Sequence, residues 1–208
     1  MPLRILTIER EYGSGGAVIA AELARRLEWK LWDQALTEEI AKLARIPPAA
    51  AERHDERPDP LLYRLAKVFA RGSYERSLAV ADADVFDTER MVSLLNQVIE
   101  QAAASGQCVI VGRGAPYILR SRRDAFHVFV YAPRELKIRR VMALGKSERE
   151  AAELVDTIDA ERAAFSKQYF DEEWPSRYLY HLWVNSNMGE SAAVETVLQA
   201  MKAHEQTS

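Results

Sequence analysis

The sequence has few of the residues that usually build disulfides, metal centres or membrane spans. It holds one cysteine, Cys108, so no disulfide can form within the chain. Cys108 lies in an apolar run, where we expect a buried thiol in a reducing, cytoplasmic setting. The four histidines, at positions 54, 127, 181 and 204, lack metal-ligand spacing. No apolar run approaches the ~20 residues of a membrane span, and no signal peptide is expected before the first strand.

The sequence also lacks a strong excess of either charge. Its 208 residues carry 28 basic and 31 acidic side chains, a net charge of −3. Nothing in this balance indicates a nucleic acid polymer or a lipid surface as partner. Hydrophobic residues make up 48% of the chain, which suits one α/β domain with a sizeable core. The sequence leaves the oligomeric state open.

Short apolar runs alternate with helical patterns along most of the chain. Strands are predicted at 3–8, 29–32, 108–111, 125–131 and 182–184, the first ending where charged residues begin at Glu9. Helices are predicted at 17–27, 37–44, 61–71, 86–104, from Pro133 onward, at 147–169 and at 189–204. This alternation predicts a parallel sheet with helices on both faces. Residues 34–105 hold no convincing strand.

A glycine-rich loop between the first strand and the first helix is the main functional signal. Tyr12 is followed by Gly13, Ser14, Gly15 and Gly16. Glycines allow backbone N–H groups to converge, and the start of a helix adds positive potential, so the segment favours phosphate.

The loop departs from the usual phosphate-loop rule, G-x-x-x-x-G-K-[ST]. Gly16 and Ala17 stand where that rule has the lysine and the hydroxyl. We expect Arg10 to supply the missing charge. Ser14 and Asp33, which follows the second strand, are the candidate Mg²⁺ ligands, Asp33 through water.

Polar residues gather where the predicted strands end. Ligands of open parallel sheets bind at the carboxyl ends of the strands. Arg10 follows the first strand, Asp33 the second, and Gly112-Arg113-Gly114 the third. Arginines beside a glycine loop favour a polyanion, phosphate above all.

Six segments in this order resemble the cytidylate kinase-like family, a nucleoside monophosphate kinase branch of the P-loop fold: REYGSGG, WDQALTEEIAKLA, VIVGRGAPYIL, HVFVYAP, IDAERA and VNSNMGE. The resemblance implies a P-loop NTPase-type three-layer α/β sandwich with a parallel five-stranded sheet. It implies one kinase domain, with its core at 1–33 and 106–208, a helical acceptor-binding insertion at 34–105 and a helical lid at about 139–169.

The resemblance also implies roles for particular residues. Gly13 to Gly16 would cradle the donor phosphates, and Asp33 would lie near the acceptor and the metal. Arg113 matches the arginine that grips the acceptor phosphate.

Four lid residues complete this set. Arg139 or Arg140 would reach the transferring phosphoryl group. Asp159 and Arg162, spaced three apart on one helix face, match the pair that holds a pyrimidine nucleotide.

The function implied is phosphoryl transfer from ATP, with Mg²⁺, to a small phosphorylated acceptor such as CMP or dCMP, giving the diphosphate and ADP. Two alternatives stay open. One is a nucleotide-binding protein that does not catalyse transfer, because the loop lysine is absent. The other is a kinase for a different small acceptor.

Overall fold

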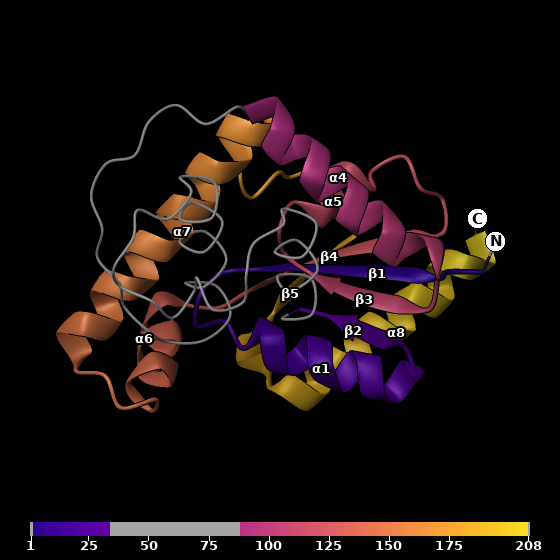
Figure 1. Cartoon of the computed structure of the whole chain (residues 1–208). Helices are drawn as coiled ribbons and strands as arrows, with labels where there is room; N and C mark the ends of the chain where they lie inside the picture. Colours follow the sequence, from indigo (N-terminus) through magenta and orange to yellow (C-terminus); the bar gives the residue numbers. More distant parts are fainter. Residues whose placement is uncertain (1, 34–87, 208) are drawn as a thin grey trace, which may run out of the picture.

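A five-stranded parallel sheet lies at the centre of the chain, in a computed structural model that describes residues 2–33 and 88–207 (Figure 1). The strand order is β2-β3-β1-β4-β5, and every neighbouring pair is parallel. The strands are β1 (Ile5–Arg10), β2 (Lys30–Trp32), β3 (Cys108–Val111), β4 (Ala125–Tyr131) and β5 (Leu182–Asn185). The predicted sheet is confirmed.

Helices cover both faces of this sheet (Figure 1). One face carries α1 (Gly16–Leu27) and α8 (Glu190–Thr207), and the other carries α4 (Thr88–Ala104), α5 (Ala115–Ile118) and α7 (Glu148–Phe170). The helix α6 (Arg134–Met142) packs against α7 beyond the end of the sheet where β1 finishes, and the short 3-10 helix η2 (Ser186–Met188) follows β5. The three-layer sandwich is therefore confirmed. The helices predicted at 37–44 and 61–71 lie outside the described residues.

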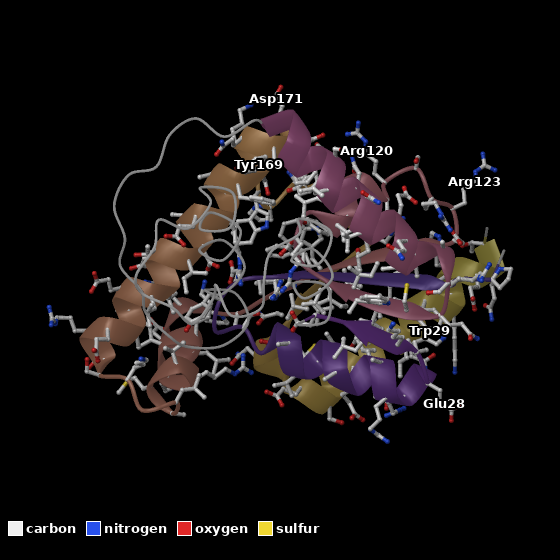
Figure 2. The ribbon with its side chains drawn as sticks, viewed as in Figure 1. Glu28, Trp29, Arg120, Arg123, Tyr169 and Asp171 are labelled. Carbon is white, nitrogen blue, oxygen red and sulfur yellow. The ribbon has the colours of Figure 1, made fainter. Side chains whose placement is uncertain are left out.

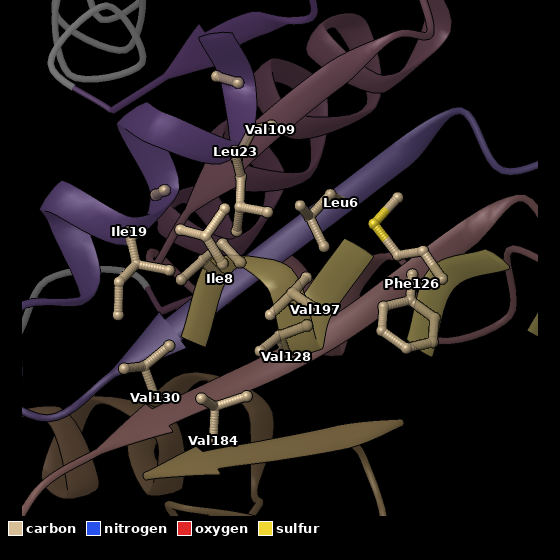
Figure 3. Packing of buried hydrophobic residues seen from close by; sticks show 14 of the residues in the cluster. Leu6, Ile8, Ile19, Leu23, Val109, Phe126, Val128, Val130, Val184 and Val197 are labelled. Carbon is tan, nitrogen blue, oxygen red and sulfur yellow. The ribbon is translucent and has the colours of Figure 1, made fainter. Parts of the chain in front are cut away.

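The alternating side chains of β1 divide the core into two layers. Leu6 and Ile8 pack with α1 and α8 on one face (Figure 3). Ile5 packs on the other face, against α4 and β3. Successive strand residues point to opposite faces, so a run that is apolar throughout fills both layers. Each large side chain buried in this way contributes about 1.5–3 kcal/mol.

The helix α4 is one layer of the sandwich. Its side chains Leu95, Val98, Ile99 and Ala102 are buried in the same cluster as Ile5. Their helical spacing forms one apolar face, which packs onto the sheet. The last part of the segment assigned to an acceptor-binding insertion, 34–105, thus belongs to the core in this structure.

The first strand is longer than predicted. We expected it to end at Ile8, but β1 continues through Glu9 and Arg10, which pair with Phe129 and Val130 of β4. The apolar β4 supplies backbone partners beyond the apolar run of β1, and this pairing outweighs the cost of placing charges in the strand. Only 4% of Glu9 and 6% of Arg10 is exposed. Both charges therefore enter the interior, on opposite faces of the sheet.

Two further predictions concern the burial of Cys108 and the absence of membrane spans. Cys108 is fully buried in β3, as expected, and burial raises the pKa of its thiol to about 11. Within residues 2–33 and 88–207, each helix is too short or too polar to cross a bilayer.

Candidate active site

The glycine loop connects the end of β1 to the start of α1. Gly13 and Gly15 have φ values of 73° and 78°, a left-handed conformation that glycine adopts without steric cost. The hydroxyl of Ser14 donates to the carbonyl of Glu11 at 2.7 Å and accepts from the N–H of Gly16 at 3.4 Å. Among the described residues, no side chain caps the start of α1 and its first turn has no acid. This helix end is therefore suited to an anion.

Arg140 and Ser186 hold the loop from the side of α6 and η2. The Arg140 guanidinium donates to the carbonyl of Ser14 at 2.7 Å and to the hydroxyl of Ser186 at 2.8 Å. The hydroxyl of Ser186 donates to the same Ser14 carbonyl at 2.6 Å. These contacts fix the position of the Ser14 peptide. Arg139, the next residue in α6, is exposed.

Lys137 is a site residue that sequence reasoning missed. Its side chain is 9% exposed, and its ammonium group lies 3.0 Å from both Glu11 Oε2 and Asp159 Oδ2. Burial lowers the pKa of Lys137, but these two carboxylates outweigh burial and the pKa is raised. In the sequence it is one of several cations after Pro133, and no local pattern marks it as buried.

Asp159 and Arg162 lie on one face of α7, as their spacing predicted, and both contact the loop segment. Asp159 accepts from the N–H of Tyr12 at 2.7 Å, and Arg162 donates to the carbonyl of Arg10 at 2.6 Å. The two side chains also pair with each other at 3.2 Å. With Lys137 they join α6, α7 and the end of β1 in one ion network. Their role toward a pyrimidine stays a prediction.

The segment after β3 brings an arginine into an unusual backbone conformation. Gly112, Arg113 and Gly114 have consecutive φ values of 68°, 60° and 75°. A left-handed conformation costs a non-glycine residue roughly 1–2 kcal/mol, and such strain is common at functional sites. Arg113 Nη1 binds Asp33 Oδ1 at 3.1 Å and the carbonyl of Val111 at 3.0 Å. This contact joins the ends of β2 and β3.

Three arginines meet near the carboxyl ends of β1 and β3: Arg10 and Arg113 are buried, and Arg162 is partly buried, with 16% of its side chain exposed. Burial, and then the charge of Arg10, lower the pKa of Arg113 to about 10. The same two causes, in the same order, lower the pKa of Arg162 to about 10. The positive charge of Arg10 therefore disfavours the protonated form of both the Arg113 and the Arg162 guanidinium groups. Concentrating positive charge in this way favours a multiply charged anion.

Other arginines lie elsewhere. Arg120 and Arg123 are exposed and project from the periphery of the molecule (Figure 2). Arg120 pairs with Glu172 at 3.0 Å. Exposed pairs of this kind contribute little to stability, and both residues belong to the exposed turn before β4.

The predicted metal ligands fit Mg²⁺ unequally. The part of the chain that the structure describes contains no cluster of three His, Cys, Asp or Glu side chains able to hold a metal. Ser14 is fully buried and its hydroxyl is engaged within the loop. Asp33 keeps 20% of its side chain exposed beside Arg113. Because Mg²⁺ retains several waters and takes few protein carboxylates, Asp33 fits a water-mediated role, and Ser14 does not in this conformation.

The fold is that of P-loop kinases of small molecules. Residues 5–188 match the cytidylate kinase-like family, and the chain belongs to that family. A comparison with curated proteins gives no match.

Solved structures share the fold over nearly the whole chain. An uncharacterized protein from Eubacterium ventriosum is 23% identical, with a TM-score of 0.67 and coverage of 96% of this chain and 98% of that one. Shikimate kinase from Acinetobacter baumannii, in complex with shikimate, is 14% identical with a TM-score of 0.53, covering 97% and 94%. A gluconokinase from Sinorhizobium meliloti is 16% identical with a TM-score of 0.54, covering 99% and 95%. At these identities the likeness concerns the fold alone.

Proposed function

We propose that the protein transfers a phosphoryl group from ATP to a nucleoside monophosphate, CMP or dCMP, giving ADP and the diphosphate. The observation that carries this proposal is the meeting of Arg10, Arg113 and Arg162 beside an uncapped glycine loop. Donor and acceptor phosphates repel each other, so their close approach needs several fixed cations. Membership of the cytidylate kinase-like family supports the choice of acceptor.

In this proposal each part of the site has a separate task. The backbone N–H groups of residues 13–16 bind the donor phosphates, and Arg113 binds the acceptor phosphate. Asp159 and Arg162 contact the pyrimidine after exchanging part of their present contacts. Arg140, or its neighbour Arg139, neutralises charge on the transferring group. The reaction is a direct transfer without a covalent enzyme intermediate, and it depends on position and charge neutralisation.

Magnesium, when bound with ATP, would neutralise charge on the donor phosphates. Asp33 would hold it through water, since this carboxylate is partly exposed where β2 ends. Ser14 would reach the metal only after releasing the carbonyl of Glu11.

Several cations of the ligand-free site are already paired with carboxylates, which affects how a ligand would enter. Among the described residues, the cations Arg10, Arg113, Arg162 and Lys137 lie beside the carboxylates of Glu9, Asp33, Asp159 and Glu11. A phosphate would therefore replace carboxylates as the partner of some cations. We infer that α6 and α7, which take part in three of these five ion pairs, shift when substrates bind.

Two features of the loop favour a second candidate function, nucleotide binding without transfer. The loop lacks the lysine, and the hydroxyl of Ser14 is turned into the loop. Both features remove groups that usually act on the donor phosphates.

The two candidates are separated by two measurements on the wild-type protein. The first records the melting temperature with ATP, CMP, dCMP, UMP, AMP and shikimate, because a bound ligand raises stability by mass action. The second records ADP release with ATP, Mg²⁺ and each acceptor. The kinase proposal predicts a shift and turnover with CMP or dCMP.

The other outcomes are equally distinct. Binding of ATP without transfer to any acceptor would support the second candidate. Turnover with a different acceptor would keep the kinase and reject CMP. No shift with any nucleotide would reject both candidates.

A further inference from the structure

The position of the missing lysine is occupied in space by another residue. In the rule G-x-x-x-x-G-K-[ST], the lysine follows the last glycine, so Gly16 stands in its place. A Cβ built on Gly16 would lie 2.6 Å from Cβ and 2.9 Å from Cγ of Arg10. Carbon atoms do not approach so closely without a shift of the backbone. The Arg10 side chain and any side chain at position 16 therefore exclude each other.

The guanidinium end of Arg10 explains why position 112 is also a glycine. A Cβ on Gly112, at the end of β3, would overlap Arg10 Nη1. The Arg10 side chain thus runs from β1, past the first residue of α1, to the end of β3. Its guanidinium also lies 3.9 Å from Glu9 Oε1, too far for a hydrogen bond.

The guanidinium group of Arg10 lies near two other arginines of the site, Arg113 and Arg162. Arg10 Nη1 reaches the backbone of Gly112, the residue before Arg113, and Arg162 Nη1 donates to the carbonyl of Arg10 at 2.6 Å, so the three residues share one region. The charge of Arg10 accordingly lowers the pKa of both Arg113 and Arg162, after burial. Arg10 thus lies among the other cations of the site, on the side where the loop leads into α1.

We propose that Arg10 is the phosphate-binding cation of this loop, supplied by the strand and passing through the space of the absent lysine. Gly16 and Gly112 are glycines because Arg10 fills the volume that their side chains would need. This inference rests on the proposed function, since it assigns a residue to the binding of the donor phosphates.

The central experiment moves the cation back to the lysine position. In the double variant R10G/G16K the clash at position 16 is removed and a lysine replaces the arginine. The matched control is R10G/G16A, which has the same strand glycine and a Cβ at position 16 but no charge. A second pair, R10K and R10M, keeps the side chain along its native path with and without charge.

The readout is binding, measured by calorimetric titration with sodium tripolyphosphate and with ATP. Circular dichroism melting of each variant shows whether it is folded. Loss of one charged phosphate contact weakens binding about ten- to hundredfold. We expect this loss in R10M and R10G/G16A, and affinities within about tenfold of wild type in R10K and R10G/G16K.

Three results would overturn the inference. One is R10M binding tripolyphosphate as tightly as the wild type. Another is R10G/G16K binding no better than a folded R10G/G16A; if either double variant is unfolded, R10K and R10M decide. The third is a wild-type protein that binds neither tripolyphosphate nor a nucleotide, which rejects the proposed function as well. In the first two cases the wild type binds and only the role of Arg10 is rejected.

Discussion

At the scale of single residues, Arg113 has a backbone conformation and a buried charge that both cost folding free energy. Its backbone is left-handed between two glycines of the same conformation, and its guanidinium is buried near Arg10. A left-handed residue other than glycine and a desolvated cation both cost free energy. The pair with Asp33 offsets part of that cost. Such an arrangement fits a residue whose task is to bind an anion.

We therefore predict that Arg113→Asn lowers kcat/KM for the acceptor at least about 100-fold. Asparagine tolerates the left-handed conformation, but Asp33 loses its partner, so we expect the free energy of unfolding to fall by roughly 1–3 kcal/mol. Steady-state ADP release and urea unfolding measure the two quantities. Arg123→Asn is the control, because Arg123 is exposed at the periphery. Unchanged kcat/KM in Arg113→Asn would remove Arg113 from the acceptor site.

At the scale of elements, the main contact at the site is that between the glycine loop and α6. A Cβ on Gly13 would lie 2.9 Å from the carbonyl oxygen of Lys137, so the two backbones touch. The Lys137 side chain then reaches Glu11 and Asp159. This close approach requires glycine for two reasons, the positive φ and the lack of space. The start of α6 therefore packs directly against the glycine loop.

Gly13→Ala should for this reason destabilise the protein by about 2–4 kcal/mol, through backbone strain plus displacement of α6. Gly145→Ala is the matched control: Gly145 has φ 92°, and a Cβ added there would meet nothing within 4 Å, so only the strain remains. Urea unfolding of both variants gives the comparison. An equal loss of unfolding free energy in the two variants would mean that contact with α6 adds no cost at position 13.

At the scale of the whole molecule, the two ends of the sheet are built differently. The carboxyl end carries the charged site, whereas the amino end of β4 carries stacked histidines. His127 Nδ1 lies 2.7 Å from Thr7 Oγ1, and the His127 N–H donates to His181 Nδ1 at 2.9 Å. Burial, and then the charge of His181, lower the pKa of His127 to about 4. His127 is thus a structural residue, buried between Thr7 and His181.

This histidine makes the fold sensitive to acid. The folded pKa lies below the ordinary value of about 6.5, so the unfolded chain binds more protons between pH 6.5 and 4. The free energy of unfolding therefore falls as the pH falls through this window, by up to about 3 kcal/mol from His127. In His127→Asn this part of the pH dependence is lost. Urea unfolding at steps from pH 7 to 4.5 tests it, and an unchanged slope would contradict it.

Much of the fold could be predicted because it depends on residues close together in the sequence. The runs at 108–111 and 125–131 are apolar throughout, which is typical of strands buried on both faces. The Gly13–Gly16 turn and the Gly112–Gly114 turn follow from local backbone chemistry. The end of β1 was predicted wrongly, because pairing with β4 carries the strand past its apolar run.

The sequence by itself determined the order of the elements, the glycine loop and the arginines at the strand ends, since each depends on a few neighbouring residues. Only the tertiary structure decided that Lys137 joins the site, that Arg140 holds the Ser14 peptide, and that Arg10 fills the space of the absent lysine. The physical reason is distance along the chain. Arg162 and the Arg10 carbonyl, for example, meet across 152 residues, and no local pattern specifies such a contact.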